Sequence, residues 1–257
     1  MQAKDIIDEV LVRSEGKSTS KRMLEGTIPG ASVFHYAMIK GDKIAMKAEG
    51  TFVRILFLCS GDATFTIEGK DYNYAEKVCV AGNHIQDIDI TANSDSDLVE
   101  IRWQVVESDI QEILNGTTVY PITCKYSEAE QYRDPFKSLK TISRAIIPQR
   151  VIPRFAMGSV ETYDEDLIGK HAHPLLDQFF FTFPENNMDL LVDDLVYPLG
   201  GDTLLYIPLG SNHGVQVKDG QTAHYIWIDF IQDAEAANAY LDEVHKPTGE
   251  IREFEDK

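Results

Sequence analysis

Residues 169–183 read GKHAHPLLDQFFFTF and place two histidines shortly before an amide and an aromatic run. His171 and His173 are two residues apart, so on an extended segment their side chains point to the same side. Gln178 follows five residues after His173, at the start of the aromatic run. Imidazole nitrogens that share one face of a strand are typical ligands of a divalent metal ion. The stretch therefore predicts a metal-binding strand in a β-rich protein.

A second stretch, residues 201–217, reads GDTLLYIPLGSNHGVQV and adds another histidine after an apolar run. Pro208 and Gly210 are typical of a turn, and His213 follows this turn. If this strand lies beside the first stretch, His213 and the Gln178 amide join the two earlier histidines as four donors. Such a set, with coordination positions left open, suits one divalent metal ion.

Short β-branched and aromatic runs separated by turns fill residues 31–106 and return over residues 142–231. The two blocks follow the same order of strand, turn, strand, turn, strand, glycine and histidine. Repetition of one rhythm predicts a duplicated all-β fold of the sandwich or barrel kind.

The organisation along the chain follows from these blocks. We expect an N-terminal domain over residues 1–117, a polar linker over 118–141 and a C-terminal domain over 142–257. Helical spacing of apolar residues predicts short helices over residues 3–13, 108–116 and 233–245.

Charge and composition exclude several classes of partner. The 257-residue chain carries 42 acidic and 24 basic side chains, so its net charge of −18 repels a phosphate backbone, and nucleic acid is excluded as a partner. It has neither a signal-type segment nor a run of 18 apolar residues, which indicates no membrane span and a cytoplasmic location. The three cysteines lack CxxC spacing and indicate reduced thiols rather than a disulfide framework.

The two quoted stretches resemble the conserved motifs of the cupin superfamily. In the first cupin motif, HxH is followed after four residues by a Glu or Gln ligand, and the second motif carries the glycine, proline and histidine order of residues 201–217. The resemblance is close over residues 142–231 and rests on strand pattern alone over residues 31–106. It implies a bicupin, that is, two tandem jelly-roll barrels with short N-terminal and C-terminal helices, and a homodimer.

The resemblance also implies the ligands of one divalent transition metal in the C-terminal barrel: His171, His173, Gln178 and His213. Imidazole and amide donors suit manganese, iron, nickel and zinc alike, so the identity of the metal stays open. Many cupins have Glu where this chain has Gln178. Asp177 lies next to it, but strand alternation predicts that this side chain turns to the other face.

The first block lacks the matching donors. If Arg54 takes the place of Gln178, then Lys47 and Glu49 stand where the two histidines of HxH belong. His84 is retained after VCVAGN, but the turn before it is one residue shorter and has no proline. We therefore expect an N-terminal barrel without a metal, with a role in dimerisation, lid formation or ligand binding.

Three imidazoles and one amide leave the double positive charge of a metal uncompensated, so the site should attract an anion. This predicts Lewis-acid activation of a small anionic substrate, such as a sugar acid or keto acid, by isomerase, lyase or hydrolase chemistry. Arg154 is our candidate for binding a substrate carboxylate, chosen from the cations before and beside HxH. Tyr206 is our candidate from the aromatic side chains that can form the walls of a small-ligand pocket.

Two other functions remain open from the sequence. A cupin dioxygenase with iron or nickel would consume oxygen. A metal-binding or ligand-binding cupin without turnover would form no product, and it stays open because no general base can be assigned from the sequence.

Overall fold

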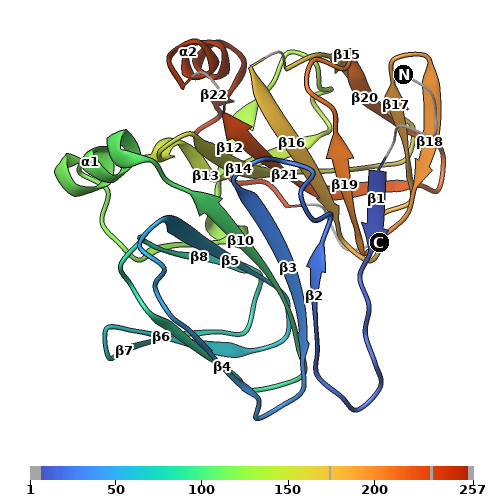
Figure 1. Ribbon diagram of the computed structural model, residues 1–257. Helices are drawn as coiled ribbons and strands as arrows, with labels where there is room; N and C mark the ends of the chain where they lie inside the picture. Colours follow the sequence, from blue (N-terminus) through green and yellow to red (C-terminus); the bar gives the residue numbers. More distant parts are fainter. Residues whose placement is uncertain (1–6, 174, 232–233, 254–257) are drawn as a thin grey trace. The chain divides into compact units, whose positions relative to one another are not determined.

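The structure is a computed structural model that describes residues 7–173, 175–231 and 234–253 (Figure 1). Antiparallel strands dominate it, and the chain divides into two compact units. We call residues 11–127 the N-terminal barrel. Residues 7–10 together with residues 128–253 form the C-terminal barrel, so its described part includes a segment from the start of the chain.

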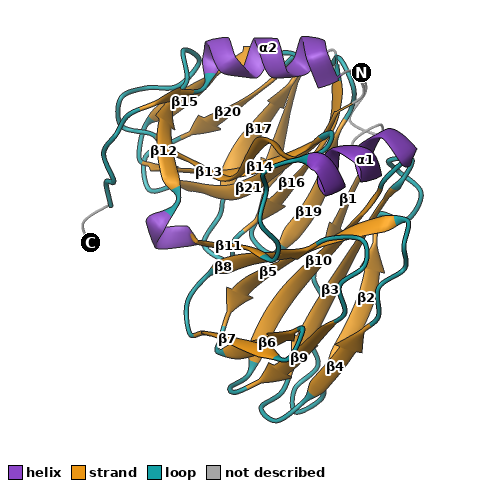
Figure 2. Ribbon diagram, turned by 90° about the vertical axis from the view of Figure 1, so that its left-hand side faces the viewer, coloured by secondary structure: helices purple, strands orange, loops and turns teal. Residues whose placement is uncertain are grey.

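Two sheets form the N-terminal barrel as far as the structure describes it (Figure 2). The six-stranded sheet has the order β11-β8-β5-β10-β3-β2, with β2 Thr19–Met23, β3 Ala31–Met38, β5 Phe52–Ser60, β8 Val78–Gly82, β10 Ser96–Gln104 and β11 Ile122–Lys125. The four-stranded sheet has the order β4-β9-β6-β7, with β4 Lys43–Met46, β6 Ala63–Ile67, β7 Lys70–Tyr74 and β9 Ile88–Ala92. The core between the sheets draws Leu56 and Leu58 from β5 and Phe65 from β6, at alternate positions.

The C-terminal barrel repeats this arrangement in its described residues. Its larger sheet has the order β1-β19-β16-β21-β14-β13-β12-β22, with β1 Ile7–Val10, β12 Glu130–Arg133, β13 Ile142–Ile152, β14 Phe155–Tyr163, β16 Leu176–Thr182, β19 Thr203–Ile207, β21 Thr222–Ile231 and β22 Lys246–Pro247. The smaller sheet has the order β15-β20-β17-β18, with β15 Asp166–His171, β17 Met188–Val192, β18 Leu195–Leu199 and β20 His213–Val217. Leu205 and Ile207 of β19 share one core with Leu190 of β17 and Val215 of β20.

These paired sheets confirm the expected all-β class with two tandem jelly-roll barrels. Helix α1, Glu107–Asn115, lies where the sequence predicted a two-turn helix, and α2, Ala234–Val244, confirms the C-terminal helix. A single turn of 3-10 helix, η2, covers Tyr126–Glu128. Residues 118–141, expected as a linker, carry β11, η2 and β12, and the division between the two units falls between residues 127 and 128.

The N-terminal helix expected over residues 3–13 is wrong where the structure describes that segment. Ile7–Val10 form β1, which pairs antiparallel with β19 so that Ile7 lies opposite Tyr206. The apolar spacing resembled a helix, yet Ile7 and Val10 are both exposed and bury no helical face. Backbone hydrogen bonds to the edge of an existing sheet outweigh a weak local helical preference here. Residues 3–6 lie outside the described residues.

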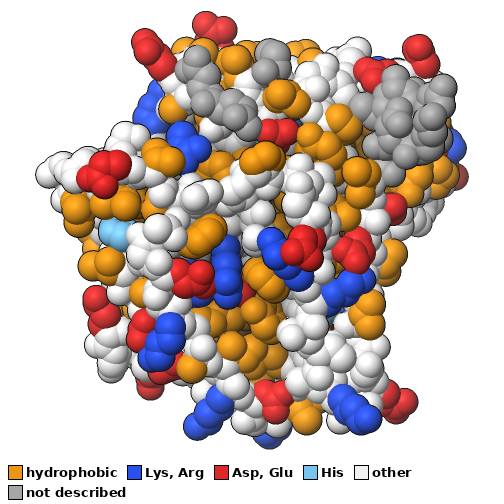
Figure 3. Space-filling view, in the orientation of Figure 1, with side chains coloured by type: hydrophobic (Ala, Val, Ile, Leu, Met, Phe, Trp, Pro, Cys, Tyr) orange, Lys and Arg blue, Asp and Glu red, His pale blue; other side chains and the backbone are white. Residues whose placement is uncertain are grey.

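The described residues contain no helix that is long and apolar enough to cross a bilayer. On the face drawn in Figure 3, basic and acidic side chains are interspersed with apolar ones rather than gathered by sign.

Candidate metal centre

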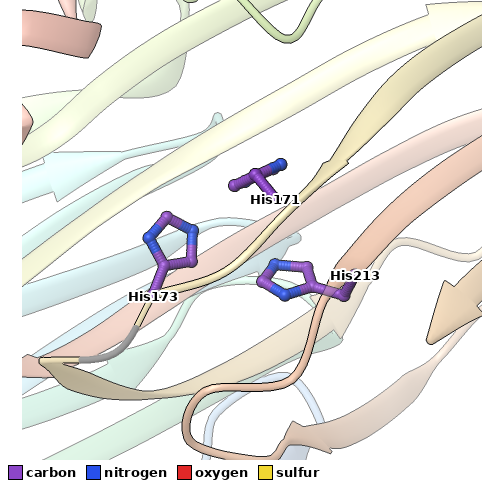
Figure 4. Close-up of side chains that lie close together, drawn as sticks. All are labelled: His171, His173 and His213. Atoms are coloured by element: carbon purple, nitrogen blue, oxygen red, sulfur yellow. The ribbon is translucent and has the colours of Figure 1, made fainter. Parts of the chain in front are cut away.

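Three histidines meet inside the C-terminal barrel (Figure 4). His171 ends β15 and His213 begins β20, and these two residues lie directly opposite each other in the sheet. His173 follows two residues after His171, and ligand nitrogens of the three side chains all lie within 4.8 Å of one another. The structure thus brings together the three imidazoles that the sequence singled out. At these separations between their nitrogen atoms, one ion can contact all three.

The close approach of the two strands depends on a glycine. Between Ile168 and His171 the register of β15 against β20 shifts, as at a β-bulge. A Cβ atom added to Gly214 would lie 2.6 Å from the carbonyl oxygen of Ile168. Only glycine therefore lets β20 pass the bulge with His213 facing His171.

Hydrogen bonds fix two of the rings. The Nδ1 atom of His171 lies 2.9 Å from the carbonyl oxygen of Gly169, and that of His213 lies 3.3 Å from the carbonyl oxygen of Ser211. A carbonyl only accepts, so each Nδ1 carries the proton and each Nε2 presents a lone pair. In metal sites, a hydrogen bond to the ring nitrogen that does not bind the metal orients the histidine. The Nδ1 atom of His173 is buried and has no hydrogen-bond partner in the described part of the chain.

Gln178 of β16 lines the same cavity and is the candidate for a fourth donor. Its Nε2 donates to the Oδ1 of Asp229 on β21 over 2.7 Å, and both side chains are buried. Its Oε1 is buried without a hydrogen-bond partner among the described residues. A buried carbonyl oxygen that nothing satisfies is costly unless something binds it, so this atom fits a place in a metal coordination sphere.

Burial keeps the imidazoles in the neutral form that binds metals. It lowers the pKa of His171 and His173, and it lowers the pKa of His213 to about 3, with the neighbouring His171 as the second cause. Burial also raises the pKa of Asp229 to about 7, although the hydrogen bond from Gln178 opposes this shift. Neutral imidazoles beside an amide form a donor set without a carboxylate.

A small cavity adjoins the histidines. The centre of a water-sized molecule can occupy a volume of about 30 Å³ within it. Its described lining residues are Tyr132, Asp134, Lys137, Val160, Ile168, His171, His173, Gln178, Phe180, His213, Gly214, Val215, Tyr225, Trp227, Asp229 and His245. Phe180 and Trp227 supply apolar walls, while Asp134, Lys137 and Asp229 supply charged groups. The space suits a metal ion with a small polar ligand.

Sequence reasoning missed Asp134, Lys137, Asp229 and His245 as cavity residues. The first two lie in the segment expected as a linker, and His245 directly follows α2. Only Asp229 carried a usable signal, because strand alternation places it on the same face of β21 as Trp227. The others come from segments without strand periodicity.

The two proposed substrate-binding residues do not line this cavity. Tyr206 alternates with Leu205 and Ile207, which face the core, and its hydroxyl donates to Asp177 over 2.9 Å. Arg154 lies in the turn between β13 and β14 with a φ of 56°. The pleat therefore turns Tyr206 away from the histidines, and it turns Asp177 away as expected.

The equivalent position in the N-terminal barrel holds an ion cluster instead. The guanidinium of Arg54 on β5 contacts Glu100 over 2.6 Å and Glu49 over 3.2 Å. Arg102 contacts the same two carboxylates, and the hydroxyl of Tyr36 donates to Glu100 over 2.6 Å. Among the described residues 11–127, no His, Cys, Asp or Glu cluster has the spacing of a metal site.

Comparisons with known proteins give structural matches only. No protein-family model matches the chain, and no curated protein matches it by sequence. A putative glyoxylate induced protein from Pseudomonas aeruginosa matches with a TM-score of 0.71 at 8% identity, covering 84% of this chain and 81% of that chain.

Two further solved structures match over most of their length. An oxalate decarboxylase from Lactobacillus farciminis, solved as a formate complex, matches with a TM-score of 0.66 at 11% identity, covering 88% of this chain and 85% of that chain. A cupin 2 conserved barrel domain protein from Leptotrichia buccalis matches with a TM-score of 0.56 at 13% identity, covering 86% and 92% of the two chains. At such identities the likeness shows the fold alone.

Proposed function

We propose that this chain, which has the bicupin fold, binds one divalent transition metal ion in its C-terminal barrel and acts on a small anionic metabolite. The ligands in this proposal are the Nε2 atoms of His171 and His213, a ring nitrogen of His173 and the Oε1 of Gln178. The observation that carries it is the convergence of three neutral imidazoles within 4.8 Å beside a buried amide oxygen that has no hydrogen-bond partner among the described residues.

The donor set decides the kind of substrate. None of the four ligands carries a negative charge, so a bound divalent ion keeps its full charge and favours an anion at its open positions. When bound, the metal supplies Lewis acidity to a carbonyl or carboxylate oxygen. The structural neighbours include oxalate decarboxylases, one described with Mn(II) centres, and these names point to small carboxylic acids.

The protein's own residues prepare the cavity for such an acid. Asp229 holds the Gln178 amide so that its oxygen stays free, and Phe180 and Trp227 limit the room for water. Asp134 and Asp229 place two carboxyl groups in the cavity, where the sequence had offered none. This favours a metal-dependent isomerase, lyase or hydrolase over a cupin that only binds its ligand.

Metal analysis followed by a substrate panel tests the proposal. Elemental analysis of the purified chain should find about one transition metal ion per chain, and the loaded protein should convert a member of a panel of keto, uronic and dicarboxylic acids. Oxygen consumption with iron or nickel bound would identify a dioxygenase instead. Metal and acid binding without any product would identify a binding protein, and a chain that takes up no metal would refute the proposal.

The resemblance also implies a homodimer, which stays a prediction. Light scattering of the purified protein measures it directly, and a mass near twice the 28.9 kDa of one chain is the expected result.

A further inference from the structure

One cation lies inside the candidate site. Of the described residues that line the cavity, Lys137 is the one lysine or arginine. Its side chain is only 8% exposed, and that of its ion-pair partner Asp134 is 5% exposed. A buried ammonium is rare and costly, and its occurrence in a ligand cavity points to a role beyond solubility.

The contacts of Lys137 leave part of its hydrogen-bonding capacity unused. Its Nζ lies 2.9 Å from a carboxylate oxygen of Asp134 and 3.4 Å from the hydroxyl of Tyr132, and it sits 5.1 Å from the centre of the Tyr132 ring. An ammonium group has three N–H donors, so one remains without a partner in the described part of the chain. The second contact is long, so it too can yield to a stronger acceptor.

The same turn connects Lys137 to the metal ligands. Asp134 accepts a hydrogen bond from the backbone N–H of Phe136 over 2.9 Å, and the carbonyl of Phe136 accepts one from Gly169 over 2.7 Å. The Phe136 ring stacks on His171, with centroids 4.6 Å apart and planes 11° apart. The turn is therefore fixed against β15, and the ammonium has a set position relative to the three imidazoles.

The electrostatic balance of the cavity favours a doubly charged ligand. The three histidines, the Gln178 amide and Lys137 line the same cavity. Asp134 neutralises the lysine, but a metal ion held by four uncharged donors adds two positive charges. The cavity then holds two cationic groups, the metal ion and the ammonium of Lys137, although Asp134 balances the charge of the second.

We propose that Lys137 binds a carboxylate of the substrate, so that the preferred substrate is a small dicarboxylate rather than a monocarboxylate or a neutral sugar. The inference rests on the proposed metal site, since the second cationic centre is the metal. A carboxylate replaces the long contact to Tyr132 with a charge-assisted hydrogen bond. Asp134 and Phe136 are positioning residues, because they act through Lys137 and His171.

Ligand titration of the Mn(II)-loaded protein tests this assignment. The probes are oxalate and acetate, and the readouts are calorimetric affinity and the Mn(II) magnetic resonance spectrum. Lys137→Met should lower the affinity for oxalate relative to acetate at least about tenfold, as expected for losing one hydrogen bond to a charged group. Lys137→Arg should retain part of the preference, because it keeps the charge.

Two further variants control for charge and folding. Lys218→Met removes a lysine that is 59% exposed and pairs with Asp189, so it should leave both affinities unchanged. Asp134→Asn combined with Lys137→Met removes both buried charges, so it should fold even if the single variant does not, and it should show the same loss of preference.

The outcomes separate this inference from the proposed function. An oxalate preference that persists in the folded double variant, with the metal still bound, would overturn the role of Lys137 and leave the metal site standing. Wild-type protein that binds no Mn(II) would refute the proposed function itself, and the inference would fall with it.

Discussion

The two barrels differ most at one equivalent place on their larger sheets. Arg54 lies on β5 opposite Arg102 of β10, and Gln178 lies on β16 opposite Asp229 of β21. Each of these strands is flanked on both sides in its sheet. The guanidinium of Arg54 is held by two carboxylates, whereas the oxygen of Gln178 has no hydrogen-bond partner in the described residues.

The difference shows two ways to place positive charge inside one kind of barrel. In the N-terminal barrel the chain supplies the cations itself, and two arginines balance Glu49 and Glu100. In the C-terminal barrel the converging groups are uncharged donors, and in our proposal a metal ion supplies the positive charge. An arginine thus occupies the position that corresponds to Gln178, one of the proposed metal ligands.

The largest effect is expected from removing one imidazole. His213→Ala should abolish metal binding, because losing a ligand costs more than the 10- to 100-fold that loss of a supporting contact costs. His84→Ala, the matched change in the N-terminal barrel, should leave the metal content unaltered. Elemental analysis after dialysis measures both. Equal metal content in the two variants would show that the site is not in the C-terminal barrel.

The next largest effect is a loss of stability when the ion cluster around Arg54 is disrupted. Arg54→Met leaves Glu100, whose side chain is 0% exposed, with Arg102 as its remaining cation. Loss of one partner from a buried ion pair should lower the free energy of unfolding of the N-terminal barrel by about 3 kcal/mol. Chemical denaturation measures the loss, and metal binding should persist. Lys47→Met, in an exposed pair with Asp87, is the control and should behave like wild type.

A smaller effect on metal affinity is expected from changing Asp229, which contacts the proposed ligand Gln178. Asp229→Ala removes the acceptor that orients Gln178, so metal affinity should fall about 10- to 100-fold. Asp229→Asn keeps an oxygen that can accept the same hydrogen bond and should lose less. Competition with a chelator measures the affinities. If the two variants bind metal as tightly as wild type, Oε1 of Gln178 is not a ligand.

Acid should affect the two barrels at different pH values. Burial, assisted by Lys137, lowers the pKa of His245 from its ordinary 6.5 to about 3, while Asp134 opposes the shift and His171 adds to it. The unfolded chain therefore takes up a proton that the folded C-terminal barrel does not. The free energy of unfolding of the C-terminal barrel should therefore fall by up to about 1.4 kcal/mol per pH unit as the pH drops from 6.5 towards 3.

The N-terminal barrel should stay folded to a lower pH than the C-terminal barrel. Burial acts to raise the pKa of Glu100, but its hydrogen bonds from Tyr36, Arg102 and Arg54 lower the pKa below 4.5 on balance. Its contribution to stability is therefore full above pH 4.5 and is lost below. The chain has two tryptophans, one in each barrel, so Trp103→Phe and Trp227→Phe give separate fluorescence signals in metal-free protein. Coincident acid transitions would contradict this difference.

Most of the fold could be predicted from the sequence because strand periodicity is local. Runs such as residues 52–59 and 63–67 alternate or remain apolar over the length of one strand, and both form strands. The histidines of the candidate site were also predictable, since His171 and His173 share one short segment. Whether they hold a metal stays a prediction.

The misses concern groups that only tertiary structure brings together. Lys137 lies in a polar turn without periodicity, and its place in the cavity depends on hydrogen bonds between that turn and β15. Arg154 and Tyr206 were chosen by residue type, while the direction of their side chains is set by a turn and by the pleat of β19. Strand β1 was missed because edge pairing imposes little pattern on four residues.

Strand β1 has a consequence for how the molecule can be assembled and divided. Residues 7–10 pair with a strand that lies roughly 200 residues later in the sequence, so this contact can form only after residues 203–206 have been synthesised. A fragment that begins at residue 128 would contain the proposed metal ligands yet expose the edge of β19. Unpaired edges of this kind invite association between molecules, so a stable isolated C-terminal barrel needs residues 7–10 grafted back or the edge otherwise protected.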